Sequence, residues 1–281
     1  MQGKTVVVTG GTSGIGEVAA TRLAGMGARI VLVARDQARA DATLAKLKAA
    51  NPSAAHTVHL GDLSSISEMK RVASAIAATE PKIDVLVNNA GAVFLSRQVS
   101  VDGLEMTFAT NHMAYFVVTN ILLPNLKATP GARIVSTASD AHRGGKIDFD
   151  DLQLEDSFGV ARAYGTSKLM NILFTRELAK RLGVGGVTAN CLHPGFVGTR
   201  FGLNNATNVF MRLLQRAIMQ FGISPEEGAK TIIHLASSPD VASISGEYFY
   251  KCKIATPTEA AQNDAVAKQL WDVSAKISGV G

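Results

Sequence analysis

The sequence predicts an α/β fold, with one doubly wound, mainly parallel sheet of about seven strands and helices on both faces. Short apolar runs of strand length alternate along the 281 residues with helix-length amphipathic segments. Strands separated by helices pair in parallel, because each connection must cross back over the sheet. The strands are apolar runs rather than alternating patterns, which is typical of a sheet covered on both faces. No linker or internal repeat divides the chain, so residues 1–281 are predicted to form a single domain.

The expected strands share β-branched or apolar side chains and are Thr5–Thr9, Ile30–Val33, Thr57–Leu60, Val85–Val87, Ile134–Thr137, Val187–Leu192 and a short run closed by Phe249. The expected helices are Ile15–Met26, Gln37–Ala50, a segment that opens at Ser65, Tyr164–Leu182 and a segment that opens at Ser224. Ser65 and Glu68 have the spacing of a capping box, and Pro225 after Ser224 is a second helix-start signal.

Composition excludes several classes of protein. Hydrophobic residues make up 47% and charged residues 18%, which is typical of a globular chain and not of a disordered one. The net charge is +5, but no basic run is longer than Lys180-Arg181, so nucleic-acid binding is not expected. The two cysteines form no disulfide framework and the six histidines are dispersed, so no metal site is predicted.

The chain is predicted to be cytoplasmic. Its first residues lead directly into Thr5–Thr9, which leaves no room for a signal peptide. No uninterrupted apolar run approaches the roughly 20 residues of a membrane span. We therefore expect no membrane segment.

A glycine-rich turn follows the first strand and opens the first helix. Gly10 permits a sharp turn, Gly14 lets the backbone approach a pyrophosphate, and Gly16 lets the helix pack closely on the strand. The free N–H groups of the helix N-terminus would then face the anion. In a chain of alternating strands and helices, this turn predicts a Rossmann-type dinucleotide site.

The end of the second strand bears on the choice of cofactor. Arg35 could hold the 2′-phosphate of NADP, whereas Asp36 could bond the ribose of NAD after a shift of one residue. We favour NADP(H) and keep NAD(H) as the alternative. Asp62, after the third strand, could accept from an adenine amino group or cap the next helix.

Tyr164 and Lys168 lie four residues apart and so share one face of a predicted helix. An ammonium near a phenol stabilises the phenolate, so we expect Lys168 to lower the pKa of Tyr164. The pair could then act as an acid for carbonyl reduction or as a base for alcohol oxidation. Ser139, just past the strand Ile134–Thr137, could orient the substrate oxygen at the carboxyl edge of the sheet. Asn88–Gly91 and Pro194-Gly195 end two other strands at the same edge.

With these motifs the chain resembles the short-chain dehydrogenase/reductase family over nearly its whole length. The resemblance is carried by Thr9–Gly16, Asn88–Gly91, Ser139, Tyr164-x-x-x-Lys168 and Pro194-Gly195. It implies that Asn111 joins Ser139, Tyr164 and Lys168 as a catalytic tetrad, that Lys168 bonds the nicotinamide ribose, and that Thr199 contacts the carboxamide. The predicted cofactor-binding residues are Gly10, Thr12, Ser13, Gly14, Ile15, Gly16, Arg35, Asp62, Leu63, Asn89, Ala90, Gly91, Tyr164, Lys168, Pro194, Gly195, Val197 and Thr199.

A narrower similarity is to the retinol dehydrogenase-like branch. It is carried by Asn111-His112, Ala141-His142, Gly145-Lys146-Ile147, Phe149–Leu152, Phe174–Leu178 and Leu192–Gly195. The branch implies NADP(H), in agreement with Arg35, although Glu17 stands where the branch often has a lysine. The family resemblance also implies dimers or tetramers formed through helices, as do the large apolar faces of Met113–Leu126 and Lys168–Leu182.

The apolar segment at residues 200–224 is expected to form a lid over the substrate; the alternatives are a helix packed on the core or a membrane-surface helix. The predicted function is an NADP(H)-dependent oxidoreductase that interconverts a hydrophobic aldehyde or ketone and its alcohol, with Tyr164 as general acid/base. The alternatives are an NAD(H)-dependent alcohol or hydroxysteroid dehydrogenase and a non-catalytic cofactor sensor.

Overall fold

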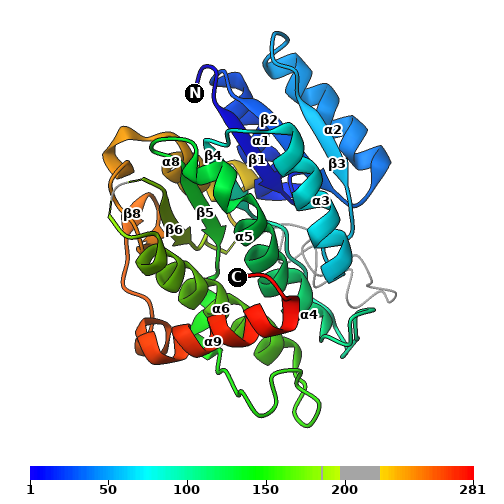
Figure 1. Cartoon of the computed structure of the whole chain (residues 1–281), viewed down its shortest axis with the longest axis vertical. Coiled ribbons are helices and arrows are strands. Elements are labelled where there is room, and N and C mark those ends of the chain that lie inside the picture. Colours follow the sequence, from blue (N-terminus) through cyan, green and yellow to red (C-terminus); the bar gives the residue numbers. More distant parts are fainter. Residues whose placement is uncertain (185, 197–221) are drawn as a thin grey trace.

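The computed structural model of the chain describes residues 1–184, 186–196 and 222–281 (Figure 1). Within these residues one sheet has the strand order β3-β2-β1-β4-β5-β6-β7-β8, and all pairs are parallel except β7 with β8. The strands are β1 Thr5–Thr9, β2 Arg29–Ala34, β3 Thr57–Leu60, β4 Val85–Asn88, β5 Arg133–Thr137, β6 Thr188–Leu192, β7 Tyr248–Tyr250 and β8 Lys253–Ile254. The predicted architecture is confirmed, and the strand beyond the expected seven is the two-residue β8, which closes a hairpin on β7.

Helices connect the parallel strands, as the alternating pattern predicts. The α-helices are α1 Gly14–Gly25, α2 Gln37–Ala50, α3 Ile66–Thr79, α4 Met106–Phe108, α5 Ala114–Lys127, α6 Val160–Leu182, α8 Pro225–Ser237 and α9 Asp264–Ser278. A π-helical segment, η1 Ala109–Met113, links α4 to α5, and 3-10 turns occur at η2 Asp140–Gly144, η3 Pro239–Val241 and η4 Glu259–Gln262. α6 begins four residues before the expected helix, so Tyr164 lies in its second turn.

The strands separate two hydrophobic cores. Along β1, Val6 and Val8 pack in one core with α1 and α8, and Val7 packs in the other with α3, α5 and α6. These alternating sides follow from the two-residue period of a strand. All three valines are fully buried, which explains why β1 is a continuous apolar run.

The C-terminal helix α9 lies on the outer side of the layer formed by α5 and α6 (Figure 1). The ring of Trp271 packs 4.9 Å from that of Phe116 on α5 and 5.8 Å from that of Phe174 on α6. Aromatic contacts at such distances add to the free energy gained from burial. The apolar surface on these helices, which favoured a helix-mediated dimer, is therefore partly covered within one chain.

Both predicted helix starts are confirmed, but the capping-box hydrogen bonds expected at Ser65 and Glu68 are not formed. Ser65 precedes α3, but its hydroxyl contacts Ser67 Oγ at 2.9 Å, and Glu68 pairs with Arg71 at 2.7 Å. The Ile66 N–H instead donates to Asp102 at 2.7 Å, so a loop 36 residues away caps the helix. At α8 the prediction is confirmed, because Ser224 Oγ accepts from the Glu227 N–H at 3.2 Å.

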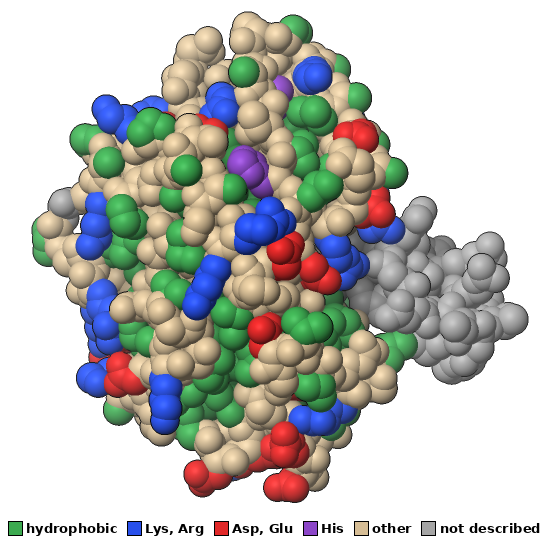
Figure 2. Space-filling view, turned by 45° about the vertical axis from the view of Figure 1, so that its right-hand side comes forward, with side chains coloured by type: hydrophobic (Ala, Val, Ile, Leu, Met, Phe, Trp, Pro, Cys, Tyr) green, Lys and Arg blue, Asp and Glu red, His purple; other side chains and the backbone are tan. Residues whose placement is uncertain are grey.

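The surface carries mixed charge. On the face drawn in Figure 2, basic and acidic side chains are interspersed and form no continuous basic stripe. Among the described helices, none combines the length and the apolar character that a bilayer crossing requires.

The strand order sets the position of the site. From β1 the chain winds outward to β2 and β3, and then returns to the other side of β1 at β4. In open sheets of this kind, ligands bind where the order reverses, at the carboxyl ends of the strands. The carboxyl ends of β1 and β4 are the glycine turn and Asn88–Gly91.

Candidate active site

The turn after β1 is a cradle that side chains would fill. Gly10 has a φ of +66°, and a Cβ there would lie 2.6 Å from Ala90 Cα. A Cβ on Gly16 would lie 2.4 Å from Gly10 O, which confirms the close helix–strand packing expected of this glycine. Thr9 Oγ1 accepts from the N–H groups of Asn89 at 3.0 Å and Ala90 at 3.1 Å, so the turn is fastened to the end of β4.

The first turn of α1 offers N–H groups to an anion. Ser13 is the N-cap residue, and its side chain makes no capping hydrogen bond. Gly14, with a φ of +56°, and the neighbouring residues Thr12 and Ile15 complete the loop. An open helix N-terminus next to a glycine cradle fits the pyrophosphate of a dinucleotide. The residues present therefore fit the pyrophosphate of a dinucleotide cofactor.

The polar residues at the ends of β2 and β3 differ in whether their side chains are already bonded within the protein. Asp36 accepts from the Arg39 N–H at 2.8 Å and caps α2, so its carboxylate already has a structural role. Arg35 is exposed and forms no ion pair with any described residue. Asp62 is exposed and accepts from the Ser64 N–H at 3.0 Å within its own loop, and Leu63 is buried in the core.

Asn111 joins two parts of the predicted site. Its Oδ1 accepts from the Ala92 N–H at 2.8 Å, and its Nδ2 donates to Ala92 O and to Ser167 Oγ, each at 3.0 Å. A Cβ on Gly91 would lie 3.2 Å from Asn111 Oδ1 and 3.7 Å from Lys168 Nζ. Asn111 thus connects the strand end at Gly91 with the helix that carries Tyr164 and Lys168. It lies in the π-helical segment η1, a local irregularity that often occurs at functional sites.

Lys168 is almost fully buried. Its Nζ donates to the carbonyl of Thr137, the last residue of β5, at 3.0 Å, and lies 5.6 Å from the centroid of the Tyr164 ring. Burial disfavours the ammonium and lowers the pKa of Lys168 to about 7.

Tyr164 differs from the expectation in its acidity. Burial raises the pKa of Tyr164 to about 12, and a hydrogen bond with Ser139 counteracts this only in part. The prediction that Lys168 lowers this pKa is wrong for the structure at hand, because desolvation of the phenolate outweighs the stabilisation by its neighbours. Tyr164 is therefore a protonated phenol at neutral pH, the form that can donate a proton.

Ser139 lies where the sequence predicts, directly after β5. Its Oγ accepts from the Ala141 N–H at 3.2 Å and caps the turn η2, and its hydroxyl forms the bond with Tyr164. The imidazole of His142 fixes the backbone of Ser139, because its Nδ1 lies 2.7 Å from Ser139 O and its Nε2 accepts from the Thr258 N–H at 3.2 Å. His142 thereby connects the C-terminal segment to Ser139.

The end of β6 is described only in part. Gly195 has a φ of +92°, and a Cβ there would lie 2.9 Å from Ile223 Cδ1, so a glycine is required after Pro194. Val197 and Thr199 lie outside the described residues, as does most of the predicted lid at residues 200–224.

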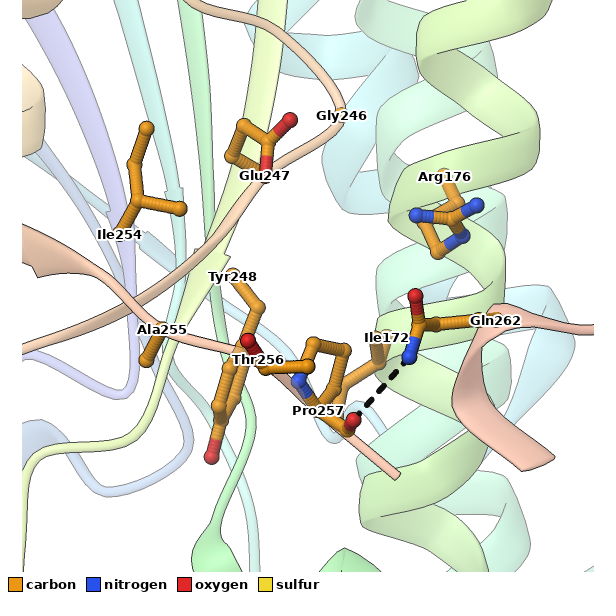
Figure 3. A pocket seen from close by; sticks show the side chains of 10 residues that line it. All are labelled: Ile172, Arg176, Gly246, Glu247, Tyr248, Ile254, Ala255, Thr256, Pro257 and Gln262. Carbon is orange, nitrogen blue, oxygen red and sulfur yellow. Dashed lines mark hydrogen bonds between the residues drawn. The ribbon is translucent and has the colours of Figure 1, made fainter. Parts of the chain in front are cut away.

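A groove of about 590 Å³ opens beside Tyr164. Its lining consists of Ala141, Gly144, Lys146, Ala161, Arg162 and Tyr164. A second, smaller cavity of about 120 Å³ lies elsewhere, with Arg176 and Ile172 of α6 on one side and Glu247 and Tyr248 on the other (Figure 3). It contains no predicted catalytic residue, and Gln262 donates to Pro257 O across it at 3.2 Å. The groove at Tyr164 is therefore the candidate substrate site.

Comparison with known sequences agrees with this geometry. The family described as short chain dehydrogenase matches residues 4–208. The chain belongs to this family. Retinol dehydrogenase 14 of Mus musculus is 39% identical over 295 residues, which cover 100% of this chain and 87% of the relative. Retinol dehydrogenase 12 of Homo sapiens is 36% identical over 280 residues, with 100% and 88% covered. The chain is thus a retinol dehydrogenase-like short-chain dehydrogenase.

Solved structures show the same fold. An uncharacterised protein from Mycobacterium paratuberculosis has a TM-score of 0.79 at 28% identity and covers 99% of this chain and 94% of that one. RhlG of Pseudomonas aeruginosa, solved as an active-site complex with NADP, has a TM-score of 0.69 at 29% identity, with 89% and 94% covered. A short-chain dehydrogenase from Burkholderia cenocepacia in complex with NADP has a TM-score of 0.68 at 27% identity, with 88% and 96% covered.

In this short-chain dehydrogenase, the sequence alone did not reveal three supporting groups. Ser167 bonds Asn111, Thr137 O accepts from Lys168, and His142 fixes Ser139. Thr137 acts through its backbone carbonyl, which no residue type encodes. Ser167 precedes Lys168 directly, but its partner comes from another element, so only the folded structure shows the contact.

Proposed function

We propose that this protein is an NADP(H)-dependent oxidoreductase that interconverts a hydrophobic aldehyde or ketone and its alcohol, with Tyr164 as general acid/base. The observation that carries the proposal is the convergence of Ser139, Tyr164 and Lys168 beside the groove. A bound nicotinamide supplies or accepts the hydride. The residues of this chain then have to hold the substrate oxygen and exchange its proton.

Tyr164 carries its proton at neutral pH, as a general acid must. With a pKa raised to about 12, the phenol keeps its proton at neutral pH and can give it to a carbonyl oxygen as charge develops there. Ser139 forms a hydrogen bond with the same hydroxyl and would bond the substrate oxygen. Lys168, held by Thr137 O, has a pKa lowered to about 7, and in its protonated form it would stabilise the phenolate left behind.

NADP(H) is supported by the end of β2. Arg35 is exposed and has no carboxylate partner among the described residues, so its guanidinium is available to a phosphate. Asp36 caps α2 and is thereby less available to a ribose hydroxyl. Glu17, which could repel a phosphate, is neutralised by Lys46 at 2.7 Å.

A hydrophobic substrate is supported by the groove and by the sequence. Ala141, Gly144 and Ala161 make the wall next to Tyr164 largely apolar. Residues 200–224 are rich in apolar side chains, including Phe201 and Phe210. The relatives in the family are named for retinol.

The experiment that tests the proposal compares two tyrosines near the same lysine. Tyr164→Phe removes the acid and is expected to lower kcat by about 10²–10⁴-fold. NADPH binding should be retained, which a fluorescence titration with NADPH measures. Tyr115→Phe is the matched control, because the Tyr115 ring lies 5.7 Å from Lys168 Nζ but does not line the groove.

Turnover is followed as loss of NADPH absorbance with a panel of aldehydes and ketones. Near-normal turnover in Tyr164→Phe would refute the assignment. NADPH binding without turnover of any carbonyl by the unmodified protein would favour a cofactor sensor instead.

A further inference from the structure

The groove beside Tyr164 combines an apolar wall with two cations. Of its lining residues, Lys146 and Arg162 carry positive charge at neutral pH, and none is acidic. An ordinary apolar aldehyde has no group that would pair with them. The groove therefore contains charged groups that a purely hydrophobic substrate would not use.

The backbone of Lys146 is fixed to the catalytic helix. Thr166 Oγ1 donates to Lys146 O at 3.0 Å and accepts from the Lys146 N–H at 3.2 Å. A Cβ on Gly145 would lie 2.5 Å from Gly165 O, so this segment is in direct contact with α6 beside Tyr164. The chain consequently holds Lys146 in a defined place relative to the reacting hydroxyl, even though its side chain is exposed.

Of the two cations, only Arg162 has a carboxylate partner among the described residues, and that ion pair is long. Lys146 forms no ion pair with any residue in the described ranges, and Arg162 has only Asp148, at 4.0 Å. On the neighbouring turn, by contrast, Arg143 is paired with Asp140 at 2.8 Å. The six lining residues thus contain two cations and no carboxylate, and the adjoining segment compensates this charge only in part, through Asp148 and Asp151 near Arg162.

We propose that Lys146 and Arg162 form an anion-binding subsite of the substrate groove, and that the preferred substrate is an aldehyde or ketone with an apolar body and a carboxylate at its far end. The inference rests on the proposed function. A guanidinium matches a carboxylate geometrically, and the lysine adds a second charge. The reacting carbonyl would lie at Tyr164 and the carboxylate toward the solvent-exposed cations.

The test uses two aldehydes of equal chain length, one ending in a carboxylate and the other in the corresponding methyl ester. The unmodified protein is expected to show a kcat/KM for the acid that is about three- to thirtyfold above that for the ester, since two exposed ion pairs contribute modestly. The preference should shrink with added salt, because exposed charges are screened.

The double variant Lys146→Gln and Arg162→Gln is expected to abolish the preference, measured within the variant as the ratio of kcat/KM for the acid to kcat/KM for the ester. Thr166 contacts only the backbone of Lys146, so the substitution leaves that anchor in place. Lys127→Gln is the matched control, because Lys127 is exposed at the carboxyl end of α5 and lies outside the groove lining. It should keep the preference.

The outcomes are distinct. Equal use of both aldehydes by the unmodified protein, or an undiminished preference in the double variant, would overturn the subsite and leave the proposed function intact. If neither aldehyde is reduced, and no uncharged carbonyl is either, the proposed function fails and the subsite fails with it.

Discussion

Acid should destabilise this protein through one buried histidine. His112, on η1, is fully buried against α6 and α9, and burial lowers its pKa from 6.5 to about 3. Ser274 Oγ gives its proton to Leu270 O at 2.8 Å, so His112 Nε2 must be the donor in the 2.8 Å contact with Ser274. His112 Nδ1 has no hydrogen-bond partner among the described residues, and the ring is neutral in the folded state.

The sign follows from proton counting. His112 is protonated below about pH 6.5 in the unfolded chain but only below about pH 3 in the folded chain. The stability present above pH 6.5 is therefore lost as the pH falls from 6.5 toward 3. Each pKa unit corresponds to about 1.4 kcal/mol. Between pH 7 and pH 5, His112 is therefore expected to reduce the free energy of unfolding by about 2 kcal/mol.

Urea unfolding at both pH values measures this loss. Trp271 is the single tryptophan of the chain and packs against Phe116 and Phe174, so its fluorescence reports the release of α9. His112→Leu removes the titrating group, while four other histidines with lowered pKa remain in both proteins: His56, His59, His142 and His193. The variant should lose about 2 kcal/mol less than the unmodified protein between pH 7 and pH 5. An identical pH dependence in both would refute the reasoning.

Two further predictions concern the site itself. Gly165→Ala places a Cβ 2.7 Å from Ala141 O and must displace η2 from α6. We expect kcat to fall by at least about tenfold while the affinity for NADPH is retained. Single-turnover kinetics and NADPH-binding measurements check the two effects separately. Arg35→Ala should weaken the binding of NADPH by about ten- to a hundredfold, because a charged hydrogen bond to the phosphate is lost, and should leave the affinity for NADH nearly unchanged. Equal effects on the two cofactors in a fluorescence titration would contradict a phosphate contact at Arg35.

The sequence was sufficient for the features that depend on local chemistry. The glycine spacing located the cradle at Gly10 and Gly16, and the alternation of strands and helices gave the parallel sheet. Partners that come from distant elements were not predictable in this way. At the start of α3, the Ile66 N–H donates to Asp102, a loop carboxylate 36 residues away, and Ser65 makes no side-chain cap. Likewise, no periodicity indicates that α9 covers the apolar faces of α5 and α6.

The acidity of Tyr164 shows why a motif alone gives incomplete chemistry. Spacing on a helix predicts that Lys168 lies near the phenol, and the structure confirms this with Nζ 5.6 Å from the ring centroid. The same burial that brings the two groups together raises the pKa of Tyr164 to about 12 and lowers that of Lys168 to about 7.

Both shifts favour the uncharged forms, because each ion would lose its hydration without full compensation. The folded site thus starts from a neutral phenol, the form that carbonyl reduction consumes. Alcohol oxidation would first require the phenol to lose its proton, which burial opposes. At neutral pH Tyr164 is thus protonated, as the proposed proton donor must be, but its raised pKa makes the proton harder to release, so the neighbouring groups would have to stabilise the phenolate that forms.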